Sequence, residues 1–298
     1  MAGRTVHSAI ILLATGNLLA LLSDVIIKWQ GTAGEFPVLQ FIFMRVMVAV
    51  LVLLPLWRHL DGRAAFRGTG VHVLRAHIGL AGISCMAIAL TTLPLATANA
   101  LFYATPLLVM VLAVLLFGER VTGLSLLAVV SGFAGILVIL RPVEISWAAL
   151  SGLGAALALA TNALLVRKLP STQSTVHKLF LMHLYAVPAA FALMLWEGAA
   201  WDWRMLVAAA GSAVFILGYN ATVLLAYRHV AANQVTSAEY TGLIWAVLFG
   251  WWWFGEVPGI WFFLGTTLIV SPLIALGIVE RRRVRCQVTT DISPIRAK

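Results

Sequence analysis

The chain has 298 residues, of which 62% are hydrophobic and only 10% are charged. So few polar side chains cannot cover a water-soluble globule of this size, which excludes a soluble protein and indicates a membrane protein. The formal net charge of +9 does not indicate nucleic-acid binding, because the basic residues are scattered at the ends of apolar runs.

Apolar runs of about 20 residues follow one another along the chain, and each is long enough as a helix to cross a hydrocarbon core about 30 Å thick. They lack the alternation of apolar and polar positions over about 10 residues that is typical of membrane-spanning strands. The sequence therefore predicts an all-α polytopic membrane protein with ten transmembrane helices. The expected spans are 7–29, 38–57, 70–92, 96–117, 121–140, 147–166, 175–196, 205–228, 233–254 and 258–279.

One short pattern occurs twice. An apolar run ends in Phe117-Gly118-Glu119 in the first half and in Phe254-Gly255-Glu256 in the second, 137 positions later. Such self-similarity predicts two related units, and we expect five-helix repeats over 1–143 and 144–280, followed by a basic tail over 281–298. Because five is odd, the second repeat enters the membrane with the opposite orientation. Inverted repeats of this kind are typical of secondary transporters.

The basic residues between the predicted spans indicate an orientation. Twelve lysine and arginine residues fall on one side of the predicted membrane and only two, Arg141 and Arg204, on the other. The more basic side of a membrane protein faces the cytoplasm. We therefore expect both termini in the cytoplasm of a bacterial cell, and a multi-pass protein of the inner membrane.

The two motifs and their surroundings resemble the drug/metabolite transporter superfamily and, within it, the ten-helix EamA-type exporters. The first half is the better match, with Pro106 in mid-span and Gly132 and Gly135 in the next span, whereas Leu243 stands in the second half where Pro106 stands in the first. The resemblance implies a central cavity lined by the first four helices of each repeat. It does not identify the solute, because this superfamily moves amino acids, nucleotide sugars, sugar phosphates, drugs and vitamins. The exporters of aromatic and other amino acids are the most similar branch in general appearance.

Candidate substrate-binding residues lie on corresponding faces of the predicted fourth and ninth helices. Counted at about 1.5 Å per residue, Tyr103 and Tyr240 each lie about 10 Å below their own membrane surface. This tyrosine pair would bracket the midplane, where such transporters hold substrate, although both side chains could equally be packing residues. The face of the fourth helix carries Asn99, Phe102, Tyr103 and Pro106, and that of the ninth carries Thr236, Glu239, Tyr240 and Leu243.

Two of these residues have further predicted roles. Pro106 removes one backbone hydrogen bond and would give the fourth helix a hinge. Glu239 is an acid inside a predicted span, where a carboxylate would bind a substrate ammonium group or carry a proton. The alternative for Glu239 is a hydrated carboxylate near the cytoplasmic face, paired with Arg228 or Lys178.

A charged group is predicted near the outer ends of the first two spans. Asp24 and Lys28 are spaced i and i+4 in the favourable order for a helical ion pair, and Arg45 would reach the same level. We interpret these three residues as a charged outer vestibule and a gate that breaks when the outer side closes. The alternative is that Lys28 extends to the interface while Asp24 neutralises Arg45 for stability alone.

Three further residues complete the predicted binding site. They are Asn220, His183 and Trp245, and Trp245 differs from the other tryptophans because it lies near mid-span. Single polar residues in membrane helices also bond across helix interfaces, so a packing role is the alternative for each. The Phe-Gly-Glu ends are interpreted structurally, as tight helix ends at which the glutamate meets water.

These observations favour a secondary transporter that exports small organic metabolites by alternating access. Amino acids, including aromatic ones, are the substrate class that the resemblance favours. Other drugs, nucleotides or vitamin-type solutes are the alternative within the superfamily, and a channel or a membrane-embedded lipid-modifying enzyme are alternatives of other classes. We expect no enzyme, because the seven histidines are dispersed, and no cofactor or metal, because phosphate-loop, HExxH and CxxC motifs are absent. The expected partners are a small solute and membrane lipid, with protons as a candidate coupling ion. Monomer and homodimer are both compatible with the sequence.

Overall fold

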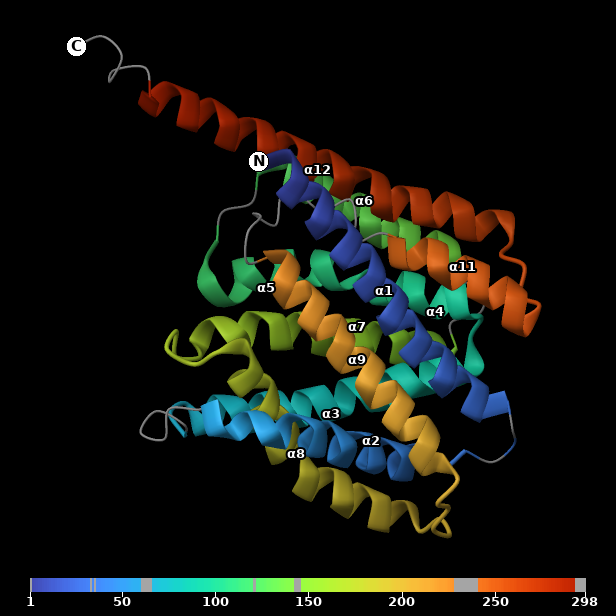
Figure 1. Ribbon diagram of the computed structural model, residues 1–298. Helices are drawn as coiled ribbons and strands as arrows, with labels where there is room; N and C mark the ends of the chain where they lie inside the picture. Colours follow the sequence, from blue (N-terminus) through green and yellow to red (C-terminus); the bar gives the residue numbers. More distant parts are fainter. Residues whose placement is uncertain are drawn as a thin grey trace.

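The computed structural model describes residues 2–32, 34, 36–59, 66–119, 122–141, 146–227 and 241–292, and all regular structure in these ranges is helical. The chain winds back and forth through a bundle of long helices (Figure 1). The α-helices are α1 (Ala2–Thr32), α2 (Val38–Leu53), α3 (Thr69–Thr92), α4 (Leu95–Phe102), α5 (Thr105–Phe117), α6 (Gly123–Leu140), α7 (Trp147–Leu165), α8 (Thr175–Glu197), α9 (Met205–Tyr227), α11 (Thr241–Phe254) and α12 (Ile260–Ile292). Short 3-10 helices, η1 (Leu54–His59) and η3 (Val166–Lys168), extend α2 and α7.

The length and hydropathy of these helices are those of a polytopic membrane protein. Eight helical segments, from His7–Thr32 to Met205–Ala226, are long and apolar enough to cross a membrane, and two shorter apolar helices follow at Thr241–Phe254 and Ile260–Leu276. The predicted all-α membrane fold is thus confirmed. The count of ten spans stays a prediction, because the ninth expected span is described only from Thr241 onward.

The expected continuous span over 96–117 is divided into α4 and α5. The division falls at Tyr103 and Ala104, where the Ala104 N–H donates to the Leu101 carbonyl only three residues back. Pro106 lies in the first turn of α5, where its missing N–H leaves no helical hydrogen bond unmade. An uninterrupted helix would have required that donor, so the proline explains why the helix restarts here.

The last helix is longer than the sequence predicted. It continues to Ile292, beyond the expected end at 279. Residues 280–292 contain no proline or glycine, so nothing in the basic segment stops the helix at the predicted boundary.

The two halves of the chain interlock. The N-terminal end of α1 and the C-terminal end of α12 lie on the same side of the bundle, at the left of Figure 1. One core of buried side chains is shared by α1, α2, α3, α4, α8, α9 and α11, and a second by α4, α5, α6, α7 and α12. The helix pairs in contact across the halves include α1 with α9, α2 with α8, α3 with α7, α4 with α11, and α6 with α12.

Helices α6 and α12 approach each other backbone to backbone. A Cβ atom placed on Gly135 would collide with the carbonyl oxygen of Gly265, and one placed on Gly265 would collide with the carbonyl oxygen of Gly135. Small residues allow this close approach in lipid, where apolar side chains gain nothing by leaving the hydrocarbon.

The change Gly135→Ala should therefore destabilise the protein. Alanine is favoured over glycine within a helix by about 1 kcal/mol, but overpacking against a backbone oxygen costs about 1–3 kcal/mol. The net loss should appear as a lower unfolding midpoint in detergent, followed by tryptophan fluorescence. Gly123→Ala is the matched control, since a Cβ on Gly123 at the start of α6 meets open space, and equal midpoints for the two variants would contradict the close contact.

Candidate functional site

The helices that end in the two Phe-Gly-Glu motifs finish in the same way. Gly118 and Gly255 both have φ of 65°, a left-handed conformation that glycine adopts without strain. In each motif the glycine N–H donates to the carbonyl oxygen four residues back, and the glutamate N–H to the one six residues back. The bond from the glycine N–H is that of the αL motif of a helix C-terminus, and the glutamate N–H adds a second bond to the last turns of the helix. Each cap places its glutamate just beyond the helix end.

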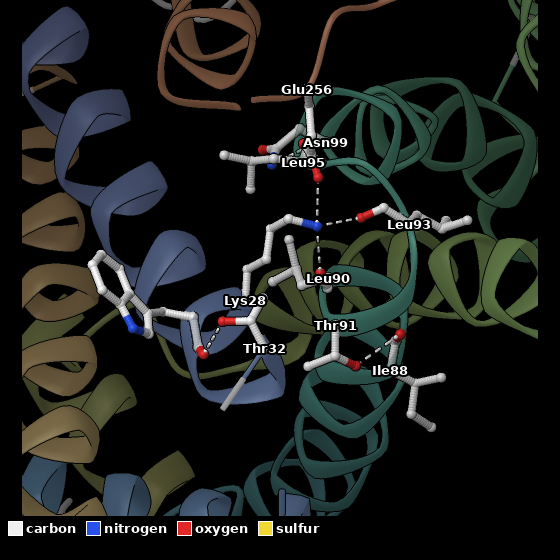
Figure 2. A network of polar contacts seen from close by, with 10 residues as sticks. Lys28, Thr32, Ile88, Leu90, Thr91, Leu93, Leu95, Asn99 and Glu256 are labelled. Carbon is white, nitrogen blue, oxygen red and sulfur yellow. Dashed lines mark hydrogen bonds and ion pairs between the residues drawn. The ribbon is translucent and has the colours of Figure 1, made fainter. Parts of the chain in front are cut away.

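Glu256 joins several helices at one end of the bundle (Figure 2). Its Oε1 lies 2.8 Å from the Nζ of Lys28 near the end of α1, and its Oε2 accepts a 2.6 Å hydrogen bond from the N–H of Leu95 at the start of α4. Lys28 also donates to the carbonyl oxygens of Leu90 at 3.3 Å and Leu93 at 2.7 Å, at the end of α3. We call the contact between Lys28 and Glu256 the Glu256 ion pair. The end of the bundle at which it lies is called the Lys28 end.

The Glu256 ion pair is largely shielded from solvent, with side chains that are 7% exposed for Lys28 and 21% for Glu256. The last carbonyls of a helix carry partial negative charge and the first N–H groups carry partial positive charge. Lys28 meets the C-terminus of α3, while Glu256 meets the N-terminus of α4. Each charge thus has a helix end of opposite sign as a second partner, which offsets the cost of burying the pair.

A second ion pair of the same kind lies at the opposite end of the bundle. Nη1 of Arg167 lies 2.6 Å from Oε1 of Glu119, and the Arg167 guanidinium lies 5.8 Å from the Phe117 ring, as Lys28 lies 5.3 Å from the Phe254 ring. We call this the Glu119 ion pair and its side the Arg167 end. The side chains of Arg167 and Glu119 are 52% and 50% exposed, so water screens their interaction. In both ion pairs the glutamate of one half binds the cation at the end of the first helix of the other half.

The three residues of the predicted group, Asp24, Lys28 and Arg45, have different charged partners in the structure. Lys28 pairs with Glu256 instead of Asp24, and it is too buried to extend to the interface as the alternative expected. The Asp24 carboxylate accepts a hydrogen bond from the side chain of Asn99 and interacts electrostatically with Arg45. Within the described ranges, no ion pair of 4.0 Å or less joins Asp24 to Arg45.

Two arginines lie within the spans formed by α2 and α3. Arg45 is half-buried, and Arg75 is only 6% exposed, with its Nη2 3.6 Å from the sulfur of Met182 on α8. His183, the next residue on α8, interacts electrostatically with both arginines. Its Nδ1 bonds to the Leu179 carbonyl of its own helix at 2.8 Å, so Nε2 is the ring atom left to face other groups.

Tyr103 stands where α1, α4 and α11 meet. The side chain of Asn17 on α1 donates to the Thr241 hydroxyl on α11 at 3.1 Å. A Cβ placed on Gly242 would lie 2.5 Å from the Tyr103 hydroxyl and 3.6 Å from the Cβ of Asn17. This predicted substrate-binding tyrosine is thus close to the residues that link the two halves.

The other predicted residues are placed separately. Trp245 on α11 packs against Phe249 with ring centroids 6.2 Å apart, and its indole N–H is buried with no partner in the described part of the chain. Asn220 donates within α9 to the Ile216 carbonyl at 2.8 Å, and Phe102 packs against the first core. Trp245 is therefore the one of these three with an unused donor.

Two predicted site residues, Glu239 and Tyr240, lie outside the described residues. The pairing of Tyr103 with Tyr240 across the midplane therefore stays a prediction. The same is true of the role of Glu239 in binding an ammonium group or carrying a proton.

Four residues of the site were not predicted from the sequence: Glu256, Glu119, Arg167 and Arg75. A signal for the first three was present, because the motif that supplies each glutamate is duplicated and a basic residue ends the first helix of each half. Arg75 has no such duplicated signal and is identified only by its burial.

Comparison with known protein families gives two matches along the chain. The model of the EamA-like transporter family matches residues 7–141 and, a second time, residues 146–277. The chain belongs to the EamA-like transporter family. The predicted resemblance to EamA-type transporters is confirmed.

Several relatives of this EamA protein are transporters of named solutes. A riboflavin transporter of Brucella anthropi is 28% identical over 272 residues, covering 85% of this chain and 92% of that protein. The pseudopaline exporter CntI of Pseudomonas aeruginosa is 25% identical over 282 residues, covering 91% and 98%. An S-adenosylmethionine uptake transporter of Rickettsia prowazekii is 24% identical over 269 residues, covering 88% and 89%. The relatives are transporters, so this chain is a membrane transporter for small molecules and not an enzyme.

A solved crystal structure is also similar. It is 19% identical, covers 93% of this chain and 98% of its own, and has a TM-score of 0.61. At this identity the similarity shows the fold alone.

Proposed function

We propose that this EamA-family protein is a secondary transporter that exports small organic metabolites by alternating access, with amino acids, including aromatic ones, as the first candidates. The observation that carries the proposal is the reciprocal pair of glutamate ion pairs. Each links the two halves of the chain, and the two lie at opposite ends of the bundle. Breaking one ion pair while the other holds would open a path between the halves to one side of the membrane at a time.

The helix contacts support an inverted repeat with halves 1–143 and 144–280. If spans are numbered within each half, the first helix packs on the third helix of the other half in both directions, as α1 on α9 and α7 on α3. The second, fourth and fifth helices pack on their own counterparts, as α2 on α8, α4 on α11 and α6 on α12. Exchanging the halves leaves this set of contacts unchanged, which is the pattern expected from a two-fold axis in the membrane plane.

The two ends differ in how tightly they are sealed. The Glu256 ion pair is shielded and bonded to two helix ends, whereas the Glu119 ion pair is half exposed. The distribution of basic residues favours the Arg167 end and both termini as cytoplasmic. In that orientation the described conformation is the one sealed more firmly towards the outside. Proton coupling would rest on Glu239.

A second candidate substrate class is vitamin-type solutes. It is favoured by the name of the Brucella anthropi relative, a riboflavin transporter. Riboflavin belongs for this reason in the first panel of test solutes, beside phenylalanine, tryptophan, glutamate and S-adenosylmethionine.

Counterflow in proteoliposomes tests the proposal. Vesicles that hold the full chain and an excess of one unlabelled solute should take up the same labelled solute transiently above its equilibrium level, and the initial rate should saturate. A channel would give neither saturation nor overshoot. The absence of overshoot with every solute of the panel would contradict alternating access for these substrate classes.

A further inference from the structure

We propose that the transported solute carries an anionic group, a carboxylate or a phosphate, and that Arg45 and Arg75 bind this group within the membrane. The inference deepens the proposed function and rests on it for transport. Binding of an anion to the two arginines is a separate claim, and it can be measured without transport.

The first observation is that both guanidinium groups have unused donors. Nη1 of Arg45 and both Nε and Nη1 of Arg75 are buried without a hydrogen-bond partner among the described residues. Among the described residues, the one hydrogen-bond acceptor of the Arg75 side chain is the sulfur of Met182, a weak acceptor. Buried polar groups in a folded protein are nearly always bonded, so an arginine that serves only structure would have these donors satisfied.

The second observation is the balance of charge. Lys28 has Glu256 as its counter-charge, and Arg45 has Asp24 as an electrostatic neighbour. In the described ranges no carboxylate lies within 4.0 Å of Arg75. One guanidinium is therefore left over, and an uncompensated charge inside a membrane protein is costly and points to function.

The third observation is the chemistry of the donors. Arginine presents a planar fork of N–H groups that matches the two oxygens of a carboxylate or a phosphate. Three buried donors on two such forks call for acceptors that carry negative charge. A neutral solute would satisfy fewer donors and would leave the charge uncompensated.

The fourth observation is where the groups lie along the membrane normal. Arg45 is seven positions after the start of α2 at the Lys28 end, and Arg75 is six positions after the start of α3 at the Arg167 end. At about 1.5 Å per residue they lie about 10 Å and 9 Å below opposite surfaces of a core about 30 Å thick. His183, on a helix that packs against both α2 and α3, lies between them. An anion moving through the bundle would thus pass from one arginine to the other.

An anionic solute also fits export. A membrane potential of 100 mV, negative inside, favours the outside for each net negative charge by roughly 50-fold in concentration at equilibrium. A uniporter could therefore expel such a solute without a second coupling ion.

The experiment compares matched probes that differ in one anionic group: riboflavin with riboflavin 5′-phosphate, and indole-3-acetamide with indole-3-acetate. Each pair is measured as competitor of counterflow and, independently, as a ligand that raises the unfolding midpoint of the purified full chain in detergent.

We expect the anionic member of at least one pair to act at a concentration at least about 10-fold lower than that of the neutral member. Arg45→Gln and Arg75→Gln should each remove about 10- to 100-fold of this preference, as expected for one charged hydrogen bond. Arg45→Lys should retain part of it.

Arg141→Gln is the matched control, because Arg141 lies at the end of α6 over the ring of Trp261 at 5.4 Å, away from the other arginines. Equal action of the neutral and anionic members on the wild type would overturn the inference, and so would a preference that survives both glutamine variants. Counterflow with neutral solutes would then leave the proposed transport function standing. Conversely, a midpoint shift by the anionic probe that Arg45→Gln abolishes would support the anion site even if no probe were transported.

Discussion

Replacing Lys28 with methionine should loosen the Lys28 end of the protein and lower its stability by about 3 kcal/mol. The change leaves Glu256 as a shielded charge without its cation, and it removes the donor that the Leu90 and Leu93 carbonyls share at the end of α3. Removing one partner of a buried ion pair costs about 3–5 kcal/mol, and the 21% exposure of Glu256 places the loss at the lower end. Arg167→Met at the other end should cost at most about 1 kcal/mol, because both partners of the Glu119 ion pair are half exposed.

Two measurements check this difference. The first is the unfolding midpoint in detergent, and the second is the rate at which a thiol reagent labels Ala96→Cys in a chain whose two native cysteines are serine. Ala96 is buried and lines, with Glu256, a cavity of about 190 Å³. Lys28→Met should accelerate labelling, whereas Arg167→Met should not. Equal effects of the two single variants would contradict the unequal sealing of the two ends.

A double variant separates the charge from the seal. Lys28→Met combined with Glu256→Met should recover most of the lost stability, because no uncompensated charge remains. Counterflow should stay impaired, since the two halves then lack the contact that reforms in each transport cycle. Recovery of both stability and transport would show that the Glu256 ion pair is dispensable as a gate.

The helices could be predicted because lipid leaves the backbone few choices. Every N–H and C=O in the hydrocarbon core must bond within the protein, so a long apolar run becomes a helix. The expected span 175–196 is α8 at Thr175–Glu197, and 147–166 is α7 at Trp147–Leu165 with one 3-10 turn added. Two helices add detail to the expected spans: a turn beside Pro106 divides the span Leu95–Phe117 into α4 and α5, and the basic segment after 280, which contains no helix breaker, continues α12.

The charged contacts could not be predicted in the same way, because they depend on which helix ends meet. The i, i+4 spacing favoured Asp24 as the partner of Lys28, a local interaction of about 0.2–0.5 kcal/mol. Glu256 and the carbonyls at the end of α3 together stabilise the Lys28 ammonium group by more than this, but these groups come from distant parts of the sequence. Arg75 lies near the start of its span, where basic residues are often hydrated, and it is buried in a bundle in which α7 and α8 both pack against α3.

Asp24→Asn should destabilise the protein through Arg45. Asparagine keeps the shape of the side chain and can still bond to Asn99, but it removes the carboxylate that interacts electrostatically with Arg45. Because Asp24 is only 8% exposed and Arg45 keeps some solvent contact, we expect a loss of about 1–3 kcal/mol, below that for a fully buried pair. In a double-mutant cycle with Arg45→Gln, the two changes should be coupled by about 0.5–3 kcal/mol. Additive effects on the unfolding midpoint would contradict the interaction.

The same variant gives opposite results for the two interpretations of the charged interior. If Arg45 binds the anionic group of the solute, Asp24 competes with that group, and Asp24→Asn should tighten binding of riboflavin 5′-phosphate by about 5-fold. This factor corresponds to a repulsion of about 1 kcal/mol between two like charges a few ångströms apart in a hydrated site. Binding of riboflavin should not change. If Asp24 instead binds a substrate ammonium group, cationic probes such as tryptamine should bind more weakly to Asp24→Asn while riboflavin 5′-phosphate is unaffected. The sign of the change, read with one anionic and one cationic probe on one variant, therefore decides which charge in this part of the membrane interior faces the solute.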